Sequence, residues 1–326
     1  MKQLLKTSLV LLCLIPTPNL YGKVKILTWW SYIHPDTIKS LNKITPDTEI
    51  ITYKTNDNAI ARLSHNREGF DIAIISNVAI KVLRSADPGL FLMEPQLKSR
   101  YDYIDWINKD TKCIPYFWSI TTFMYDSRSI DFIPNTLQSL IRTQKYGYKI
   151  AIVDDPFEFA ARYKSDYKIP LSTFHSDLKN IPPSAFVSSI ADFKSYNKVA
   201  AYEWSGTNPQ IFKESSWFKM ALPKNKIIVG YDAICSLRSS GKPNNKIKNK
   251  VLKILSSKRS LESMTKMVQY YSPIKDHFYG LNEQSKKTLE QLKEREKKEK
   301  FILLDKESVK TFHEYKSNWR RLRYGP

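Results

Sequence analysis

The sequence predicts an α/β protein of two lobes, each a mostly parallel sheet flanked by helices. Short apolar runs typical of strands alternate with segments of helical periodicity, a pattern typical of a parallel sheet covered by helices on both faces. The alternation occurs in two units, which are connected by apolar stretches at Ile114 to Tyr125 and at Ile227 to Leu237. The length of 326 residues agrees with two domains of about 150 residues each.

The first unit alternates strands and helices regularly. A helix is predicted at Pro35 to Asn42, where Ile38 and Leu41 share one face, and a second helix at Asn58 to Ser64. Strands are predicted between them at Val24 to Thr28, Thr48 to Tyr53 and Asp71 to Ile75.

The second unit contains predicted strands at Lys149 to Val153 and Val199 to Glu203. Beyond it, Ser239 to Arg259 is rich in lysine and has no acid, and its apolar stripe predicts an amphipathic helix with a solvated basic face. An anion or nucleic-acid site is the alternative there. Lys286 to Lys300 predicts a charged surface helix. The chain closes on a helical stripe expected to dock on a lobe: Phe312, Tyr315, Trp319 and Leu322.

Composition excludes several classes of protein. Hydrophobic residues make up 42% and charged residues 26%, values unlike those of disordered, collagen-like or multi-span membrane chains. The 52 Lys and Arg against 32 Asp and Glu give a net charge of +20, which suits nucleic acid, an anionic membrane or merely a lysine-rich surface. Because no aromatic residues interleave with the basic ones in the lysine-rich segment, we expect no nucleic-acid partner.

The N-terminus predicts a secretory signal peptide. Lys2 and Lys6 precede an apolar run that is far shorter than the roughly 20 residues of a membrane-spanning helix, and the segment ends near Gly22. Cys13 raises lipidation as an alternative, but the Leu12 before it is not the small residue that such a signal needs. We therefore expect a periplasmic chain, and losing the two lysines lowers its charge from +20 to +18.

The chain lacks the residue patterns of the common catalytic and metal sites. Its five histidines are scattered without ligand spacing, and neither a Gly-rich phosphate loop nor a Gly-x-Ser-x-Gly elbow is present. We therefore predict no enzyme activity, cofactor or metal. Cys113 and Cys235 remain after signal cleavage; we expect two free buried thiols, with one bridge as the alternative.

Aromatic and acidic side chains recur just after the predicted strands. In such sheets ligands bind outside the C-terminal ends of the strands. Carboxylates accept charge-assisted hydrogen bonds from ammonium groups, and aromatic faces add about 0.5–2 kcal/mol each of cation–π attraction, so the combination suits an organic cation such as a polyamine. The aromatic and acidic residues concerned are Trp29 and Tyr32, Asp155 and Glu158, Trp204, and Asp232, and the polar Ser76 ends another of the predicted strands.

Each of these residues also has a purely structural interpretation. Asp155 before Pro156, with Glu158 three positions on, fits a helix N-cap with a capping-box acid. The tryptophans and Tyr32 fit core or rim positions. Asp232 lies in an apolar run, where a carboxylate is costly unless it is paired, and this favours a functional role.

The chain resembles the periplasmic substrate-binding proteins of spermidine/putrescine ABC transporters, a family of bacterial extracellular solute-binding proteins. The resemblance covers nearly the whole chain from about Lys25. Its collinear blocks are Trp29-Trp30-Ser31-Tyr32-Ile33-His34-Pro35, Tyr53-Lys54-Thr55-Asn56-Asp57, Phe70-Asp71-Ile72 through Ser76, Ile114-Pro115-Tyr116-Phe117-Trp118, Asp154-Asp155-Pro156-Phe157-Glu158, Trp204-Ser205-Gly206 and Tyr270-Tyr271-Ser272-Pro273.

The resemblance implies a type II periplasmic-binding-protein fold, in which the ligand is held between two lobes that close about a hinge. It implies an aromatic wall at Trp29 and Tyr32, a hydroxyl at Ser76 and an amine-binding carboxylate at Asp232. It also implies paired acids at Asp155 and Glu158, an aromatic platform at Trp204 and a closing tyrosine at Tyr270. The implied segments are residues 1–22 as signal peptide, 23–118 with 238–326 as lobe one, and 119–237 as lobe two, with hinge strands near 114–126 and 231–238.

Three positions depart from the family pattern. Val78 replaces a tyrosine, Gly230 replaces an aromatic residue, and Thr207 stands where putrescine-preferring members carry an acid. Two lost aromatic contacts at about 0.5–2 kcal/mol each would cost a decade or more in affinity or make room for a bulkier ligand. The particular polyamine therefore stays open.

The expected function is capture of a polyamine of the spermidine/putrescine class and its delivery, as a monomer, to an ABC transporter permease in the inner membrane. One rival is a polyamine-responsive sensor that docks on a membrane signalling receptor. Another is the same fold with an anion or amino acid as its ligand.

Overall fold

The structure is a computed structural model in which the helices and strands of both predicted units are described. The described residues are 23–64, 66, 69–93, 97, 100–108, 112–168, 181–182, 185–187, 198–206, 217–238, 245–299, 301–304, 319–320 and 322. Within them, eleven strands form one continuous sheet, whose main path runs β2-β1-β3-β10-β5-β8-β6-β7. The proposed signal peptide and Thr207 lie outside these residues.

Lobe one is the half of the sheet built around three parallel strands. Strand β1 pairs with β2 on one side and with β3 on the other. The elements are β1 (Lys25–Trp29), α1 (Pro35–Asn42), β2 (Glu49–Tyr53), α2 (Asn56–Leu63), β3 (Ile72–Ser76), α3 (Asn77–Ala86), β4 (Phe91–Leu92) and the short α5 (Asp105–Asn108). The predicted α1 is confirmed residue for residue, and the other predicted elements agree to within two residues at each end.

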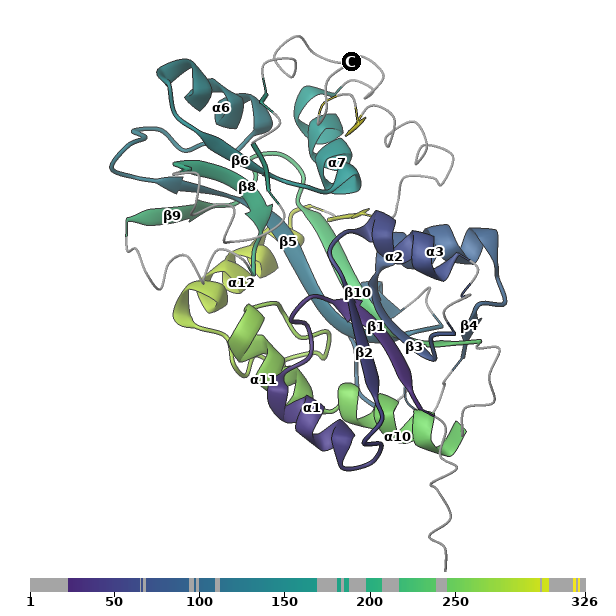
Figure 1. Cartoon of the computed structure of the whole chain (residues 1–326). Helices are drawn as coiled ribbons and strands as arrows, with labels where there is room; N and C mark the ends of the chain where they lie inside the picture. Colours follow the sequence, from purple (N-terminus) through teal and green to yellow (C-terminus); the bar gives the residue numbers. More distant parts are fainter. Residues whose placement is uncertain are drawn as a thin grey trace, which may run out of the picture.

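Both faces of this parallel sheet are buried, as the sequence predicted. On β3, Ala73 and Ile75 pack with α2 and α3 in one apolar core, whereas Ile72 and Ile74 pack with α10 and α11 in a second core on the opposite face. Figure 1 shows α2 and α3 on one side of β1–β3, and α1, α10 and α11 on the other. The apolar runs are continuous because parallel strands with two covered faces need apolar side chains in both directions.

Lobe two is the other half of the sheet. Its elements are α6 (Leu137–Arg142), the 3₁₀ turn Thr143–Tyr146, β6 (Ile150–Val153), α7 (Pro156–Tyr167), β7 (Phe186–Val187), β8 (Ala200–Trp204) and β9 (Phe218–Ala221). Strand β6 pairs in parallel with both β7 and β8. The core contains Phe123, Ile152, Phe159 and Tyr202. The buried Arg162 on α7 pairs with Asp166 at 2.6 Å.

Two long strands connect the lobes. Strands β5 (Ile114–Asp126) and β10 (Ile228–Leu237) pair antiparallel and run through the centre of the molecule (Figure 1). Strand β10 also pairs with β3 in lobe one, and β5 pairs with β8 in lobe two. The two halves of the sheet are therefore continuous through these strands.

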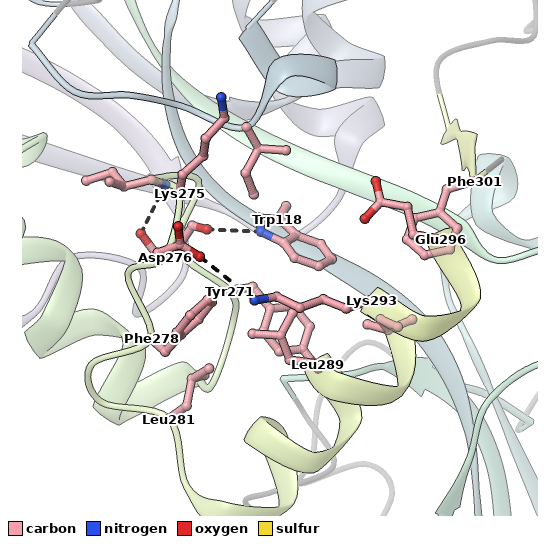
Figure 2. A pocket seen from close by; sticks show the side chains of 14 residues that line it. Trp118, Tyr271, Lys275, Asp276, Phe278, Leu281, Leu289, Lys293, Glu296 and Phe301 are labelled. Atoms are coloured by element: carbon pink, nitrogen blue, oxygen red, sulfur yellow. Dashed lines mark hydrogen bonds and ion pairs between the residues drawn. The ribbon is translucent and has the colours of Figure 1, made fainter. Parts of the chain in front are cut away.

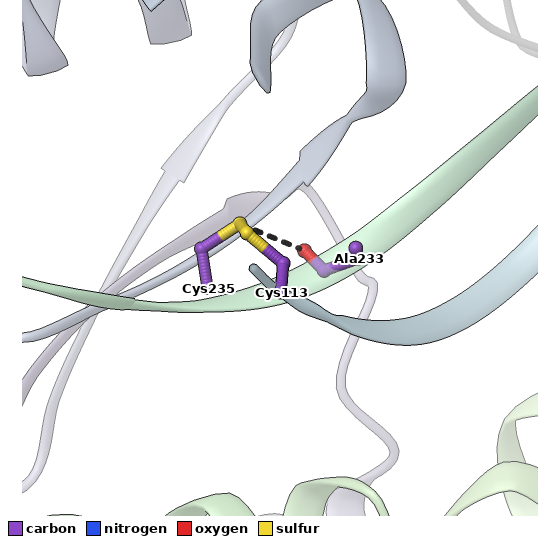
Figure 3. The surroundings of a disulfide bond; sticks show 3 residues. All are labelled: Cys113, Ala233 and Cys235. Atoms are coloured by element: carbon purple, nitrogen blue, oxygen red, sulfur yellow. Dashed lines mark hydrogen bonds between the residues drawn. A yellow bond between two sulfur atoms is a disulfide. The ribbon is translucent and has the colours of Figure 1, made fainter. Parts of the chain in front are cut away.

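A disulfide joins Cys113 to Cys235, so the expectation of two free thiols is wrong. Cys113 directly precedes β5, and Cys235 lies near the end of β10, with their Cα atoms 4.4 Å apart (Figure 3). The sequence could not decide between free thiols and a bridge, because the two cysteines are 122 residues apart and only the β5–β10 register brings them opposite each other.

The C-terminal part contributes α10 (Asn245–Leu255), α11 (Lys258–Val268), α12 (Glu283–Glu296) and β11 (Ile302–Leu303). The apolar stripe of α10 is buried, as predicted, and Lys248 on the same helix is buried with it. Trp319 packs against Phe159 and Phe186 of lobe two, which confirms docking for that residue of the stripe; Phe312 and Tyr315 lie outside the described residues. Among the described helices, none has the length and apolar character needed to cross a membrane.

Candidate functional site

The eight residues predicted from the sequence lie around the junction of the two lobes. Trp29 ends β1, Ser76 ends β3, Asp155 and Glu158 begin α7 just after β6, and Trp204 ends β8. Asp232 lies within β10, and Tyr270 follows α11. Tyr32 lies between β1 and α1. Apart from Asp232, in the middle of β10, these residues lie at or just beyond the ends of strands and helices, where α/β sheets bind their ligands.

Asp232 is held by the two aromatic donors of lobe one. The indole Nε1–H of Trp29 donates to Asp232 Oδ1 at 3.1 Å, and the hydroxyl of Tyr32 donates to Oδ2 at 2.8 Å. In the register of the sheet, Asp232 lies opposite Ser76. The carboxylate that the apolar sequence context singled out is therefore fixed in orientation at the junction.

Glu158 is held in the same way by lobe two. The hydroxyl of Thr121, on β5, donates to Glu158 Oε2 at 2.6 Å, and Trp204 Nε1–H donates to Oε1 at 3.4 Å. Glu158 is buried, and no capping box forms at the start of α7, so the capping-box interpretation is wrong for this residue.

Aromatic rings connect the two carboxyl groups across the junction. The ring centroids of Trp29 and Trp204 are 6.2 Å apart, and those of Tyr32 and Tyr270 are 6.0 Å apart. The ring of Tyr270 also lies against Gly206, where any added Cβ would meet it. Residues from the two lobes are thus in direct contact.

Asp155 is the N-cap of α7, which confirms its structural interpretation. Its Oδ1 accepts the backbone N–H groups of Phe157 and Glu158 at 2.9 and 3.0 Å. Its Oδ2 accepts the side-chain amide of Asn56, at the start of α2, at 2.7 Å. Ser76 in turn donates to the Asn56 side-chain oxygen at 2.6 Å. Asp155 and Ser76 are therefore joined through Asn56.

Burial dominates the electrostatics of these acids. It raises the pKa of Asp155 and of Asp232 to about 6, although their hydrogen bonds act in the opposite direction. Burial, together with the neighbouring Asp155, raises the pKa of Glu158 to about 8. Glu158 is therefore largely protonated at neutral pH, and a cation beside it would favour its ionised form.

Glu203 is a further buried acid that the sequence reasoning missed. Its Oε1 accepts the backbone N–H of Trp204 at 3.0 Å. Burial raises its pKa to about 8, and the nearby Glu158 and Asp154 act in the same direction. The available signal was the one used for Asp232, an acid within an apolar strand. Asn56 and Thr121 were also missed, because a polar residue at a helix start or within a strand is common without any ligand.

Of the departures from the family pattern, Gly230 lies beside a carboxyl group of the site. A Cβ added at Gly230 would lie 3.7 Å from Glu158 Oε1 and 4.0 Å from Asn77 Oδ1, so the position faces Glu158 and has room for a small side chain. Tyr231 is buried in the apolar core of lobe one, and Val78 is buried in the first turn of α3.

A cavity of about 210 Å³ lies apart from these eight residues, none of which lines it. Apolar side chains, including Trp118, Tyr271 and Phe278, form its walls (Figure 2). At its rim the ammonium of Lys293 lies 4.2 Å from the ring centroid of Phe278 and 4.0 Å from Asp276. This cavity has no buried carboxylate, so it does not share the chemistry of the junction. In the described part of the chain, no three His, Cys, Asp or Glu side chains are grouped to hold a metal ion.

Comparison with known proteins establishes the fold class. No protein-family model and no curated protein matches the chain. Among solved structures, the substrate-binding protein PotD of a spermidine/putrescine ABC transporter from Streptococcus pneumoniae, in complex with calcium and HEPES, is 16% identical, with coverage of 92% of this chain and 98% of that one and a TM-score of 0.69. The TpPotD lipoprotein of Treponema pallidum is 13% identical, with coverage of 93% and 100% and a TM-score of 0.68.

Other matches carry other ligands in their names. A periplasmic thiamin binding protein is 10% identical, with coverage of 94% of this chain and 98% of that one and a TM-score of 0.62. A GABA receptor and an acarbose-binding receptor match as well. The chain therefore has the α/β periplasmic-binding-protein fold of type II, as predicted, and these matches share that fold across several ligand classes.

Proposed function

We propose that this protein is a periplasmic solute-binding protein that captures a polyamine between its lobes and delivers it to the permease of an ABC transporter, catalysing no reaction. The observation that carries the proposal is the pair of carboxyl groups, Asp232 and Glu158, each held by an aromatic N–H and a hydroxyl at the junction of the lobes. Among the described residues, neither carboxyl forms an ion pair with a lysine or arginine.

Unpaired acids at such a position cost stability unless a ligand compensates them. Burial removes the hydration of both carboxyl groups, and this loss is the main reason that their pKa is raised. For Glu158 the neighbouring Asp155 adds to the rise, whereas Arg162 acts in the opposite direction. An ammonium group of the ligand would compensate the carboxylate charge in place of the lost water. The neighbouring rings of Trp29, Trp204 and Tyr270 would cover the methylene groups of the polyamine. The matches whose names include spermidine and putrescine support the same ligand class.

The net positive charge of the chain does not contradict a cationic ligand. At physiological ionic strength, exposed charges are screened beyond about 8 Å, whereas buried pairs are screened much less. The acids of the junction therefore outweigh the distant surface lysines once the ligand has arrived, and the surface charge acts mainly on the rate of capture. That charge suits contact with an anionic membrane surface or an acidic permease face.

The proposed cellular context follows from the N-terminus and from the two connecting strands. Cleavage near Gly22 would release the chain into the periplasm, with residues 23–118 and 238–326 as one lobe and 119–237 as the other. Bending near 114–126 and 231–238 would open and close the junction around the ligand.

The test is isothermal titration calorimetry of residues 23–326, unfolded and refolded to remove any carried ligand. Putrescine, cadaverine, spermidine, norspermidine and spermine form the panel, with GABA and thiamin as comparison ligands. The proposal predicts saturable one-site binding to a member of the polyamine panel. Binding of only a comparison ligand, or no binding by a folded protein, would reject it.

A further inference from the structure

Asn56 forms a direct bridge between the two lobes. It is the first residue of α2 in lobe one, and its side-chain amide donates to Asp155 Oδ2 of lobe two at 2.7 Å. Its side-chain oxygen accepts the hydroxyl of Ser76, the N-cap of α3, at 2.6 Å. Asn56, Ser76 and Asp155 are all buried. The bridge is therefore shielded from water, where hydrogen bonds are worth most.

Asp155 is already provided with donors on both of its oxygens. Oδ1 accepts the backbone N–H groups of Phe157 and Glu158, and Oδ2 accepts from Asn56. The N-terminus of α7 also favours a negative charge at its cap. Asp155 thus accepts three hydrogen bonds from the protein when the lobes are in contact, although burial still raises its pKa to about 6. Asp232 and Glu158 also accept a hydrogen bond on each oxygen. Asp155 differs from Glu158 because one of its donors, Asn56, belongs to the other lobe, and it differs from Asp232 because it lies on a helix of lobe two rather than on a connecting strand.

We propose that Asn56, with Ser76 and Asp155, is a latch that holds the lobes closed, and that Asp155 acts through this latch rather than by binding the ligand. The part concerning the ligand rests on the proposed polyamine function, whereas the part concerning closure rests only on the contacts of Asn56. Ser76 and Asp155, which were expected to touch the ligand, are then positioning residues. Asn56 is a third positioning residue, which the sequence did not reveal.

Two substitutions separate the latch from the charge. Asn56→Leu removes both side-chain hydrogen bonds and keeps the branching and the number of side-chain heavy atoms. Asp155→Asn removes the charge, but it can keep the latch, because an asparagine is also a good N-cap and Asn56 can flip its amide, with the Ser76 hydroxyl turned to accept. Losing the charge at 155 also lowers the pKa of Glu158, which favours ligand binding there.

The experiment measures ligand affinity by calorimetry and lobe closure by small-angle X-ray scattering of the ligand-free protein. Asn58→Leu, an exposed position on the same helix, is the matched control. We expect Asn56→Leu to enlarge the ligand-free radius of gyration and to weaken polyamine binding roughly 10- to 100-fold, the range for a hydrogen bond to a charged group. Asp155→Asn should stay within about 3-fold of wild type. Asn56→Ala serves as a second variant if the leucine does not fold.

Either of two results would overturn the proposal. One is an Asn56 variant with the same scattering and affinity as the Asn58 control. The other is an Asp155→Asn variant that loses as much affinity as Asp232→Asn. If the wild-type protein binds no polyamine at all, the proposed function fails, and the scattering comparison alone still decides whether Asn56 holds the lobes together.

Discussion

Replacing Asp232 by asparagine isolates the charge at the centre of the site. The amide has nearly the shape of the carboxyl group, and it can keep both observed bonds, with its oxygen accepting from Trp29 and its nitrogen donating to the Tyr32 hydroxyl. Truncating one partner of a buried ammonium–carboxylate pair costs about 2–5 kcal/mol. We therefore expect polyamine affinity to fall roughly 30- to 5,000-fold.

The same change should leave the fold intact. Burial raises the pKa of Asp232 because ionisation is unfavourable there, so a neutral amide removes that cost and the melting temperature should not fall. The assay is calorimetric titration with a thermal melt of the ligand-free protein, and Asp36→Asn, an exposed acid on α1, is the control. Affinity within 3-fold of wild type in a folded protein would refute the role given to Asp232.

Three further predictions follow from the acids, the disulfide and the buried ion pair. The pKa of Glu158 is raised from 4.5 to about 8 in the folded protein, so the stability that Glu158 contributes below pH 4.5 is lost as the pH rises toward 8. In thermal melts over this pH range, Glu158→Gln should therefore gain stability relative to wild type. A difference in melting temperature that does not change with pH would contradict this. Reduction of the Cys113–Cys235 bridge, which spans 122 residues, should lower the free energy of unfolding by up to about 5 kcal/mol in denaturant titrations, and an unchanged midpoint would count against it. Arg162→Leu should cost about 3–5 kcal/mol in the same assay, because it leaves Asp166 buried without its cation; a loss under 1 kcal/mol would show that the pair is dispensable.

Much of the fold could be predicted from the sequence because its strands are buried on both faces. A continuous apolar run marked β3, and Pro35 together with the apolar face formed by Ile38 and Leu41 marked the whole of α1. The disulfide could not be predicted, because the pairing of residues 122 apart depends on the register of β5 and β10. That register follows from packing of the whole sheet rather than from any local signal.

The candidate site was predicted only in part, and the reason lies in the side chains that connect its members. Aromatic and acidic residues after strands are visible in the sequence, and Asp232 stood out as an acid in an apolar run. Asn56 carries no such signal, since a polar residue at a helix start is typical of any turn. Asp155 caps α7 through Oδ1, as the sequence indicated, but the partner of its Oδ2 could not be predicted, and only the folded arrangement shows that it is Asn56.

The most direct test of the central claim is to identify what the protein carries. The full chain would be expressed in a bacterium grown with mixed polyamines and purified from the periplasm without unfolding. Its small-molecule content would then be released and analysed by mass spectrometry beside the Asp232→Asn variant. We predict a polyamine in stoichiometric amount on the wild-type protein and much less on the variant. A neutral or anionic ligand, or equal loading of both proteins, would contradict it.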